Sequence, residues 1–286
     1  MLRRRRKSPR EDKRPPRSAQ PAQPVQGAAR SRRRARPDTP VPGDLLLPPG
    51  GLPAARREKP KTPPAAATPV EKHRVVLVTG FDPFGGEAVN PSWEICKRLP
   101  HEIAGLRVET CRVPCQFRRA IEVVAESIER HHPEMVISLG QAGGRTHLSV
   151  ERVAINVDDA RLEDNGGAHP VDEAIAANGP AAYFSTLPIK AMAIAMREAG
   201  TPAEVSNTAG TYVCNHVMYG VLHFLAGSGN RARAGFIHVP YAPEQVADKP
   251  GRASLAIDTM VQGVKAAIAA AAVHDRDVVA AEGRLD

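Results

Sequence analysis

Three side chains that could share a proton-transfer reaction stand far apart in the sequence: Cys214, His238 and Glu151. A thiol becomes a strong nucleophile when it loses its proton, and an imidazole can take that proton and later pass it to a leaving group. A carboxylate that holds the imidazole completes such a set. Together these residues could carry out nucleophilic catalysis by a thiol with a histidine as its base.

Cys214 stands at the start of a predicted helix over residues 213–225, just after a turn that contains Gly210. The free N–H groups at a helix start favour a thiolate and can hold an oxyanion. A strand, a turn, a nucleophile and a helix follow one another in the same order in hydrolases. The alternative is a buried core cysteine, which is the commoner role of a lone cysteine. His216 is not expected to reach this thiol, because residues two apart on a helix point to different sides.

His238 ends a predicted strand over residues 235–239, where it could reach a thiol on the next loop or be satisfied by backbone groups at the sheet edge. Glu151 lies in a predicted strand over 148–157, and alternation places it on the face of the apolar Val153 and Ile155. A carboxylate there needs a partner, which could be an imidazole or a nearby arginine such as Arg152 or Arg161.

Two loops could line a binding site. Arg161 lies in the acidic, turn-rich segment 158–167, where it could pair with its neighbours or donate to an oxyanion. The Gly-rich loop 80–86 lacks the sequence order of a phosphate-binding loop. Its Phe81 and Phe84 suit either the walls of a site for a small, flat, uncharged ligand or the top of the core.

Strands and helices alternate from residue 75 onward, which predicts an α/β fold. The expected strands are 75–78, 106–113, 135–139, 148–157, 203–206 and 235–239, and the expected helices are 92–99 (capped by Ser92), 117–130, 188–199, 213–225 and 255–273. We therefore predict a single three-layer α/β/α sandwich domain over residues 73–286, with reactive groups just past strand ends.

The first 72 residues differ in composition from the rest. They hold 15 of the 27 prolines and no Phe, Tyr or Trp, which predicts a disordered basic tail. Residues 1–74 carry 20 Lys+Arg and 6 Asp+Glu; subtracting these from the chain totals of 39 and 31 leaves 19 basic and 25 acidic residues. The basic charge is thus a property of the tail, which could contact nucleic acid weakly or reflect a start codon assigned too far upstream.

The four cysteines, Cys96, Cys111, Cys115 and Cys214, show neither CxxC spacing nor histidines at metal-ligand intervals. We therefore expect no metal site, and a reducing compartment. No apolar run approaches the roughly 18 residues of a membrane span, and no apolar stretch follows the Arg-rich start as in an export signal. These features predict a cytoplasmic protein without membrane contact.

Four stretches together resemble the pyroglutamyl peptidase I (pyrrolidone-carboxylate peptidase) family of cysteine peptidases. They are Thr79-Gly80-Phe81-Asp82-Pro83-Phe84-Gly85-Gly86, Glu151-Arg152-Val153-Ala154-Ile155-Asn156, Ser206-Asn207-Thr208-Ala209-Gly210-Thr211-Tyr212-Val213-Cys214-Asn215 and Gly235-Phe236-Ile237-His238-Val239-Pro240. The resemblance runs from about residue 75 to residue 272. It implies a triad of Cys214, His238 and Glu151, with Arg161 and the Cys214 N–H stabilising the oxyanion.

The resemblance also implies how a pyroglutamyl ring is bound. Phe81 and Phe84 would sandwich the ring, while Gln141 and Val213 would place its amide. Tyr212 stands where many members have Phe, so the ring is kept and the polarity of the pocket changes.

By the same resemblance, the substrates are pyroglutamyl peptides, no metal or organic cofactor is needed, and the protein is a homo-oligomer, often a tetramer. Two other functions compete at this point. One is an inactive protein tethered to nucleic acid by its basic tail, and the other is the same fold with a nucleoside or phosphate ligand.

Overall fold

Seven strands form one mixed sheet in the structure, a computed structural model that describes residues 74–283. In spatial order they are β2 (Glu102–Ile103), β3 (Leu106–Val113), β1 (Val75–Phe81), β4 (Met135–Gln141), β9 (Arg233–Val239), β5 (Leu148–Glu151) and β8 (Ala203–Ser206). The predicted tail over 1–72 lies outside the described residues. Within those residues, no helix combines the length and apolar character that crossing a bilayer requires.

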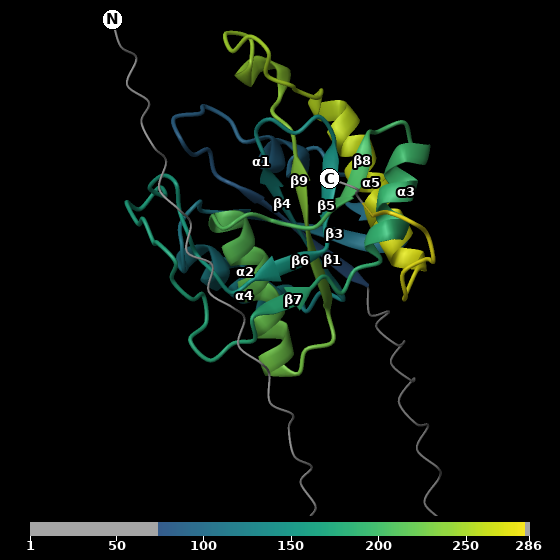
Figure 1. The fold of residues 1–286 in the computed structure, drawn as a ribbon. Coiled ribbons are helices and arrows are strands. Elements are labelled where there is room, and N and C mark those ends of the chain that lie inside the picture. The colour runs from purple at the N-terminus through teal and green to yellow at the C-terminus, as the bar shows by residue number, and fades with distance from the viewer. Residues whose placement is uncertain (1–73, 284–286) are drawn as a thin grey trace, which may run out of the picture. The chain divides into compact units, whose positions relative to one another are not determined.

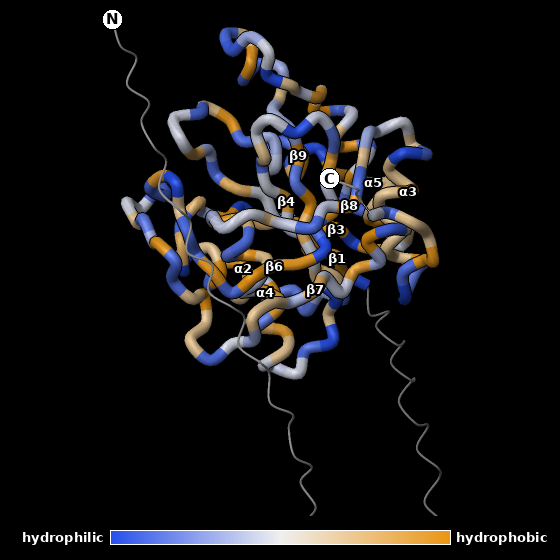
Figure 2. Tube along the Cα trace, viewed as in Figure 1, coloured by the Kyte–Doolittle hydropathy of each residue, from blue (hydrophilic) through white to orange (hydrophobic). Residues whose placement is uncertain are grey.

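The four neighbouring strands β3, β1, β4 and β9 are parallel, and the direction reverses between β9 and β5. Strands β1 and β4 are buried along their whole length, as their runs of Val, Ile and Leu require. Figure 2 shows this apolar colouring in the middle of the sheet. The carboxyl ends of β1, β4 and β9 therefore meet at one edge.

Helices cover both faces of the sheet (Figure 1). One buried cluster joins the sheet to α1 (Pro91–Cys96), α3 (Ile189–Glu198) and α5 (Ile257–Val273), and a second joins it to α2 (Arg119–His131) and α4 (Val213–Ser228). The three-layer α/β/α arrangement predicted from the sequence is confirmed. The structure adds β2, a separate two-stranded ribbon of β6 (Val153–Ile155) and β7 (Ala182–Phe184), and a short 3-10 helix, η1 (Pro243–Gln245).

The expected single strand over 148–157 is wrong, because the chain leaves the large sheet at Arg152. The Arg152 N–H donates to Ser206 O in β8 (2.9 Å), whereas its carbonyl accepts from Ser185 N beyond β7 (2.9 Å). Glu151 therefore ends β5 and does not share a face with the residues of β6. It is fully buried, whereas Ile155 is 37% exposed.

The expected cap of the first helix is also wrong. Asn90 caps α1 by accepting the Ser92 N–H at Oδ1 (3.1 Å), and the helix ends at Cys96 rather than near residue 99. The Ser92 hydroxyl accepts the Phe81 N–H instead (2.9 Å). Ser92 thus ties α1 to the carboxyl end of β1. The other predicted elements agree with the structure to within three residues at each end.

Candidate active site

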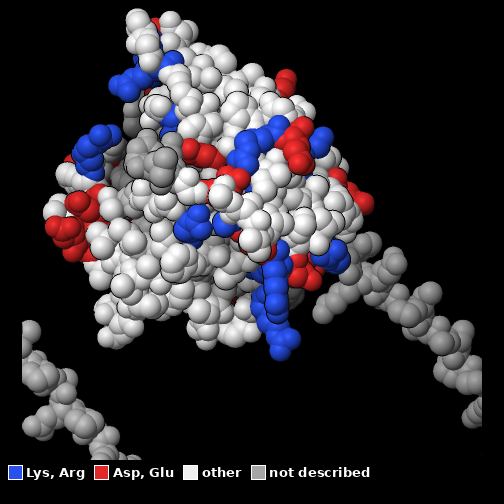
Figure 3. Space-filling view, turned by 45° about the vertical axis from the view of Figure 1, so that its right-hand side comes forward, with Lys and Arg blue, Asp and Glu red and all other residues white. Residues whose placement is uncertain are grey.

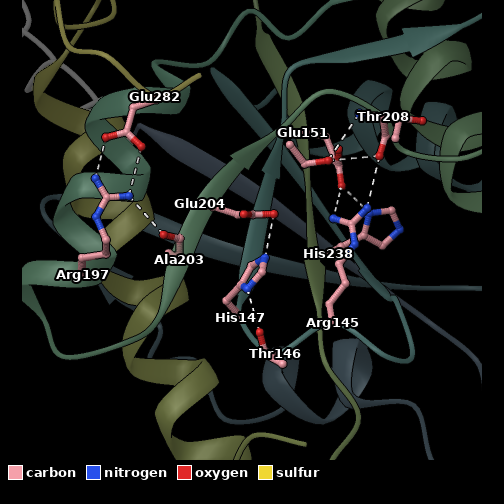
Figure 4. Close-up of polar contacts among 11 residues, drawn as sticks. Arg145, Thr146, His147, Glu151, Arg197, Ala203, Glu204, Thr208, His238 and Glu282 are labelled. Carbon is pink, nitrogen blue, oxygen red and sulfur yellow. Dashed lines mark hydrogen bonds and ion pairs between the residues drawn. The ribbon is translucent and has the colours of Figure 1, made fainter. Parts of the chain in front are cut away.

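His238 and Glu151 lie on the same face of the sheet. Ser149 stands opposite His238 in the antiparallel β5–β9 pair, and directly opposed residues point to one face, as does the residue two further along the strand. The Nδ1 atom of His238 lies 2.7 Å from Oε1 of Glu151 (Figure 4). Because a carboxylate only accepts, the Nδ1–H donates and the Nε2 atom remains to act as a base.

Cys214 is the second residue of α4, a helix whose first turn has no side-chain cap. Its N–H is therefore among the four that lack an acceptor within the helix. A β-carbon added to Gly140 would lie 2.8 Å from Cys214 Sγ, and Gly140 is the β4 partner of His238 in the β4–β9 pair. The thiol thus lies against the strand pair that carries the histidine.

Burial sets the protonation of the cysteine and the histidine. It raises the pKa of the Cys214 thiol above its ordinary value, and the charge of Glu151 acts in the same direction. Burial also lowers the pKa of His238, although its bond to Glu151 opposes this. The lowered thiol pKa expected from the helix start is thus outweighed by desolvation. At neutral pH both shifts favour the uncharged forms of the two groups, a thiol and an imidazole.

Arg145 is a site residue that sequence reasoning did not single out. Its Nη1 donates to Glu151 Oε1 (2.7 Å) and its Nη2 to Thr208 O (3.2 Å), and Figure 4 shows it beside His238. Burial alone would raise the pKa of Glu151, but His238, Arg145 and the Ser206 hydroxyl lower it below its usual value. The only signal in the sequence is an arginine that closes the Gly-rich loop after β4.

The two arginines considered as partners of Glu151 lie elsewhere. Arg152 Nε donates to Asn207 Oδ1 (2.8 Å). Arg161 is exposed and lines a cavity of about 550 Å³. The other expected partner of Glu151 is an imidazole, and that imidazole belongs to His238.

Four of the predicted binding residues lie on this cavity: Phe84, Gln141, Tyr212 and Arg161. Gln141 follows Gly140 in the chain and Tyr212 precedes Cys214 by two residues, whereas Cys214 itself is not among the lining residues. The other lining residues are Gly85, Glu87, Gly143, Asp159, Leu162, Gly210, Thr211 and Tyr241.

The remaining two predicted binding residues do not line the cavity. Phe81 is 2% exposed and packs on Phe236, with ring centroids 6.4 Å apart. Val213 is fully buried at the start of α4. The ring nearest to Phe84 in the cavity wall is Tyr212, at a centroid distance of 6.0 Å and an interplanar angle of 39°.

The turn before Cys214 holds the loop that carries Arg161. Thr211 O accepts from Asp159 N (2.9 Å), while Thr211 Oγ1 donates to Asp159 O (2.8 Å). The Tyr212 hydroxyl donates to Glu163 O (3.1 Å). These bonds lie on both sides of Arg161 in the chain, so its backbone is fixed relative to the nucleophile.

His216 has other partners than the thiol, as expected from its position. Its Nδ1 lies 2.7 Å from Asp158 Oδ2, and its Nε2 accepts the Arg118 N–H (2.7 Å). Both ring nitrogens are occupied, so His216 is not available as a base for Cys214. It joins α4 to the start of α2 instead.

Within residues 74–283, no group of three or more His, Cys, Asp or Glu side chains is placed to hold a metal ion. The four cysteines are free thiols. On the face drawn in Figure 3, basic and acidic side chains are interspersed rather than gathered by sign.

Comparison with known proteins is consistent with this geometry. A family model described as pyroglutamyl peptidase matches residues 74–274. The pyrrolidone-carboxylate peptidases of Escherichia fergusonii and Cupriavidus pinatubonensis are 53% and 55% identical over 211 and 214 residues. These matches cover 73% and 74% of this chain and 98% and 99% of the relatives. The crystal structure of pyroglutamyl peptidase I from Bacillus amyloliquefaciens superposes with a TM-score of 0.71 at 44% identity, covering 73% of this chain and all of that one.

Proposed function

Because the chain belongs to the pyroglutamyl peptidase family and is a cysteine hydrolase of that family, we propose that Cys214, His238 and Glu151 are its catalytic triad. One observation carries the proposal. Glu151 holds Nδ1 of His238, and the thiol of Cys214 packs on Gly140, the strand partner of that same histidine.

In the first half-reaction, His238 Nε2 takes the proton of Cys214 Sγ as the sulfur attacks the carbonyl carbon after the pyroglutamyl ring. The C–N bond then breaks, and the proton passes from Nε2 to the departing amine, leaving a thioester. A neutral thiol and a neutral imidazole are compatible with this transfer, because the enzyme then has no buried thiolate–imidazolium pair to maintain before the substrate binds.

In the second half-reaction, water gives a proton to His238 Nε2 and attacks the thioester carbon. The C–S bond breaks and the sulfur recovers the proton, which releases pyroglutamic acid. Glu151 keeps the imidazole oriented and stabilises its positive charge while the proton resides there.

The oxyanion formed in each half-reaction is assigned to the Cys214 N–H and the Arg161 guanidinium. The N–H belongs to the positive end of α4. Arg161 lines the cavity on a loop that Thr211 and Tyr212 hold in place. The Cys214 N–H is fixed before the reaction and can stabilise developing charge without a reorganisation cost.

For the substrate, we assign the cavity to the pyroglutamyl ring. Phe84 and Tyr212 are too close together to hold a ring between them, so they form one continuous aromatic wall against which the ring lies. Phe81 and Val213 support this wall from the buried side, and Gln141 supplies a carboxamide for the lactam. A pyroglutamyl residue carries no ammonium group, so the aromatic wall and the carboxamide can accept it without the desolvation cost of a charge.

The test is release of a fluorogenic amine from a pyroglutamyl conjugate under reducing conditions. We expect turnover by the wild-type chain and none by Cys214→Ala. Cys111→Ala is the matched control, because Cys111 is also a free thiol outside the cavity, bonded to the Ser127 hydroxyl (3.1 Å). Retained activity in Cys214→Ala, or equal loss in both variants, would rule out the assigned nucleophile.

The location and assembly expected from the sequence are also proposals. Four free thiols support a reducing, cytoplasmic location. Phe184 (67% exposed) and Ile155 (37% exposed) lie on the same face of the β6–β7 ribbon, and an exposed apolar patch of this kind supports association with further copies of the chain. Sedimentation velocity of the wild type and of Phe184→Ser would test the homo-oligomer, which should dissociate in the variant.

A further inference from the structure

The side chain of Gln245, in η1, contacts Gln141, a residue that lines the candidate substrate cavity. Gln245 is buried at 5% exposure. The Oε1 atom accepts the Ala242 N–H (3.0 Å), and the two hydrogens of Nε2 are shared among Gln141 Oε1 (2.9 Å), Glu87 Oε2 (3.2 Å) and Val89 O (3.3 Å). Every polar atom of this carboxamide therefore has a protein partner.

These partners determine which way the Gln245 carboxamide is turned. A backbone N–H can only donate, so the Gln245 atom that faces Ala242 is the oxygen. A carbonyl and a carboxylate only accept, so the atom that faces Val89 and Glu87 is the nitrogen. Lys249 Nζ lies 2.6 Å from the other Glu87 oxygen, an ion pair that favours Glu87 as an acceptor.

The orientation of Gln245 then determines that of Gln141. Since Gln245 presents an N–H to it, Gln141 has to turn its oxygen toward Gln245 and its NH2 group the other way. Gln141 is a lining residue of the cavity. The group that it can offer to a ligand is consequently a donor and not an acceptor.

We propose that Gln245 is a positioning residue that locks Gln141 as a hydrogen-bond donor to the ring carbonyl of the pyroglutamyl residue. This rests on the proposed function, in which the cavity holds that ring. A carboxamide without this lock would turn its oxygen toward the ring carbonyl for part of the time, and two acceptors repel. The lock also selects for a ring that carries a carbonyl, which a prolyl ring lacks.

The experiment uses the full chain with Gln245→Met, Gln141→Met and the double variant. Two measurements are made: kcat/KM on a pyroglutamyl fluorogenic amide, and inhibition by two small rings. The first ring, 2-pyrrolidone, has both an N–H and a carbonyl, and the second, cyclopentanone, has the carbonyl alone. Gln262→Met is the matched control, since Gln262 bonds only Ala199 O on the surface.

We expect Gln245→Met to lower kcat/KM about 10-fold, which corresponds to the free energy of about one hydrogen bond. The loss should appear mainly as a higher KM. Inhibition by both rings should weaken by the same factor. In the Gln141→Met background, Gln245→Met should cause no further loss, because its effect passes through Gln141. The control should match the wild type, and melting temperatures will show whether each variant is folded.

Three outcomes would overturn the inference. An equal loss from Gln245→Met with and without Gln141 would mean a merely structural role. A loss confined to 2-pyrrolidone would mean that Gln141 accepts from the ring N–H. An active Gln245→Met with wild-type KM would mean that no lock is needed. Failure of the proposed function looks different: Gln141→Met itself would then leave kcat/KM unchanged, or Cys214→Ala would remain active.

Discussion

Gly140 and Cys214 are in direct contact, and this contact needs a residue without a side chain. A β-carbon at Gly140 would lie 2.8 Å from the sulfur and 2.6 Å from Phe236 Cζ. Both distances are shorter than carbon normally allows. The absence of a side chain on β4 therefore sets how closely the nucleophile approaches the sheet that carries His238.

We expect Gly140→Ala to lower kcat/KM about 100-fold, because the new methyl group displaces the sulfur from its line to the imidazole. The fold should persist with a lower melting temperature. Gly227→Ala is the control: it lies in α4, and its added β-carbon would meet nothing within 4 Å. This control should keep full activity and gain up to about 1 kcal/mol of stability. Equal kinetics for the two variants would contradict the role given to Gly140.

Arg145 should control the acid side of the pH profile. Its charge lowers the pKa of His238 and also that of Glu151. Arg145→Met removes both effects, so His238 becomes protonated at a higher pH and the acid limb of kcat/KM moves upward. The limb is measured from pH 4 to 8. An unmoved limb would mean that Arg145 serves only to hold the loop through Thr208.

Arg161 should behave differently from Arg145, because it lies on the cavity and not on the triad carboxylate. If it stabilises the oxyanion, Arg161→Met lowers kcat about 100-fold and leaves the acid limb where it is. Arg161→Lys keeps the charge and should recover part of the rate. A variant with a raised KM and normal kcat would assign Arg161 to substrate binding instead.

The proposed triad should make the protein less stable in acid. The pKa of His238 is below its ordinary value of 6.5, so below pH 6.5 the unfolded chain binds a proton that the folded chain does not. Glu151 acts in the same direction below its ordinary value of 4.5. The free energy of unfolding therefore falls as pH drops. Urea titrations at pH 5, 6 and 7 should show a smaller fall for His238→Gln than for the wild type.

Asp277 should contribute to stability but not to catalysis. The N-cap of α3, Pro188, has no side-chain acceptor, and Asp277 supplies one from the C-terminal segment. Its Oδ1 accepts the N–H groups of Lys190 (3.0 Å) and Ala191 (3.1 Å). Asp277→Ala should lower the free energy of unfolding by about 0.5–1 kcal/mol with unchanged kcat/KM. Asp277→Asn, which keeps an acceptor, should lose less.

Two of the three proposed catalytic residues occupy positions that the local order of the sequence predicts. Cys214 starts a helix, His238 ends a strand, and the family motifs surround both. The partner of Glu151 could not be chosen in the same way. Three arginines lie within about ten residues of it, and which one reaches the carboxylate depends on loop geometry. Arg145 does so because its loop also contacts Thr208, a residue 63 positions away.

Two further features depend on contacts that no local pattern reveals. The predicted strand over 148–157 is broken because the backbone of Arg152 bonds both β8 and the residue after β7. The alternation of apolar residues in the sequence continues past Arg152, so it gives no sign of the break. Gln245 lies 104 positions from Gln141, and its own surroundings suggest only a turn. Both features arise when distant segments meet.

Strands β4 and β9 lie side by side in the interior of the seven-stranded sheet, with a paired neighbour on each outer side. They carry Gly140, Gln141 and His238. Amide groups in such strands exchange with solvent only when the whole domain opens. We therefore expect these three residues to lie in the slowest-exchanging part of the molecule, and denaturant to abolish turnover at the same concentration at which the sheet itself is lost.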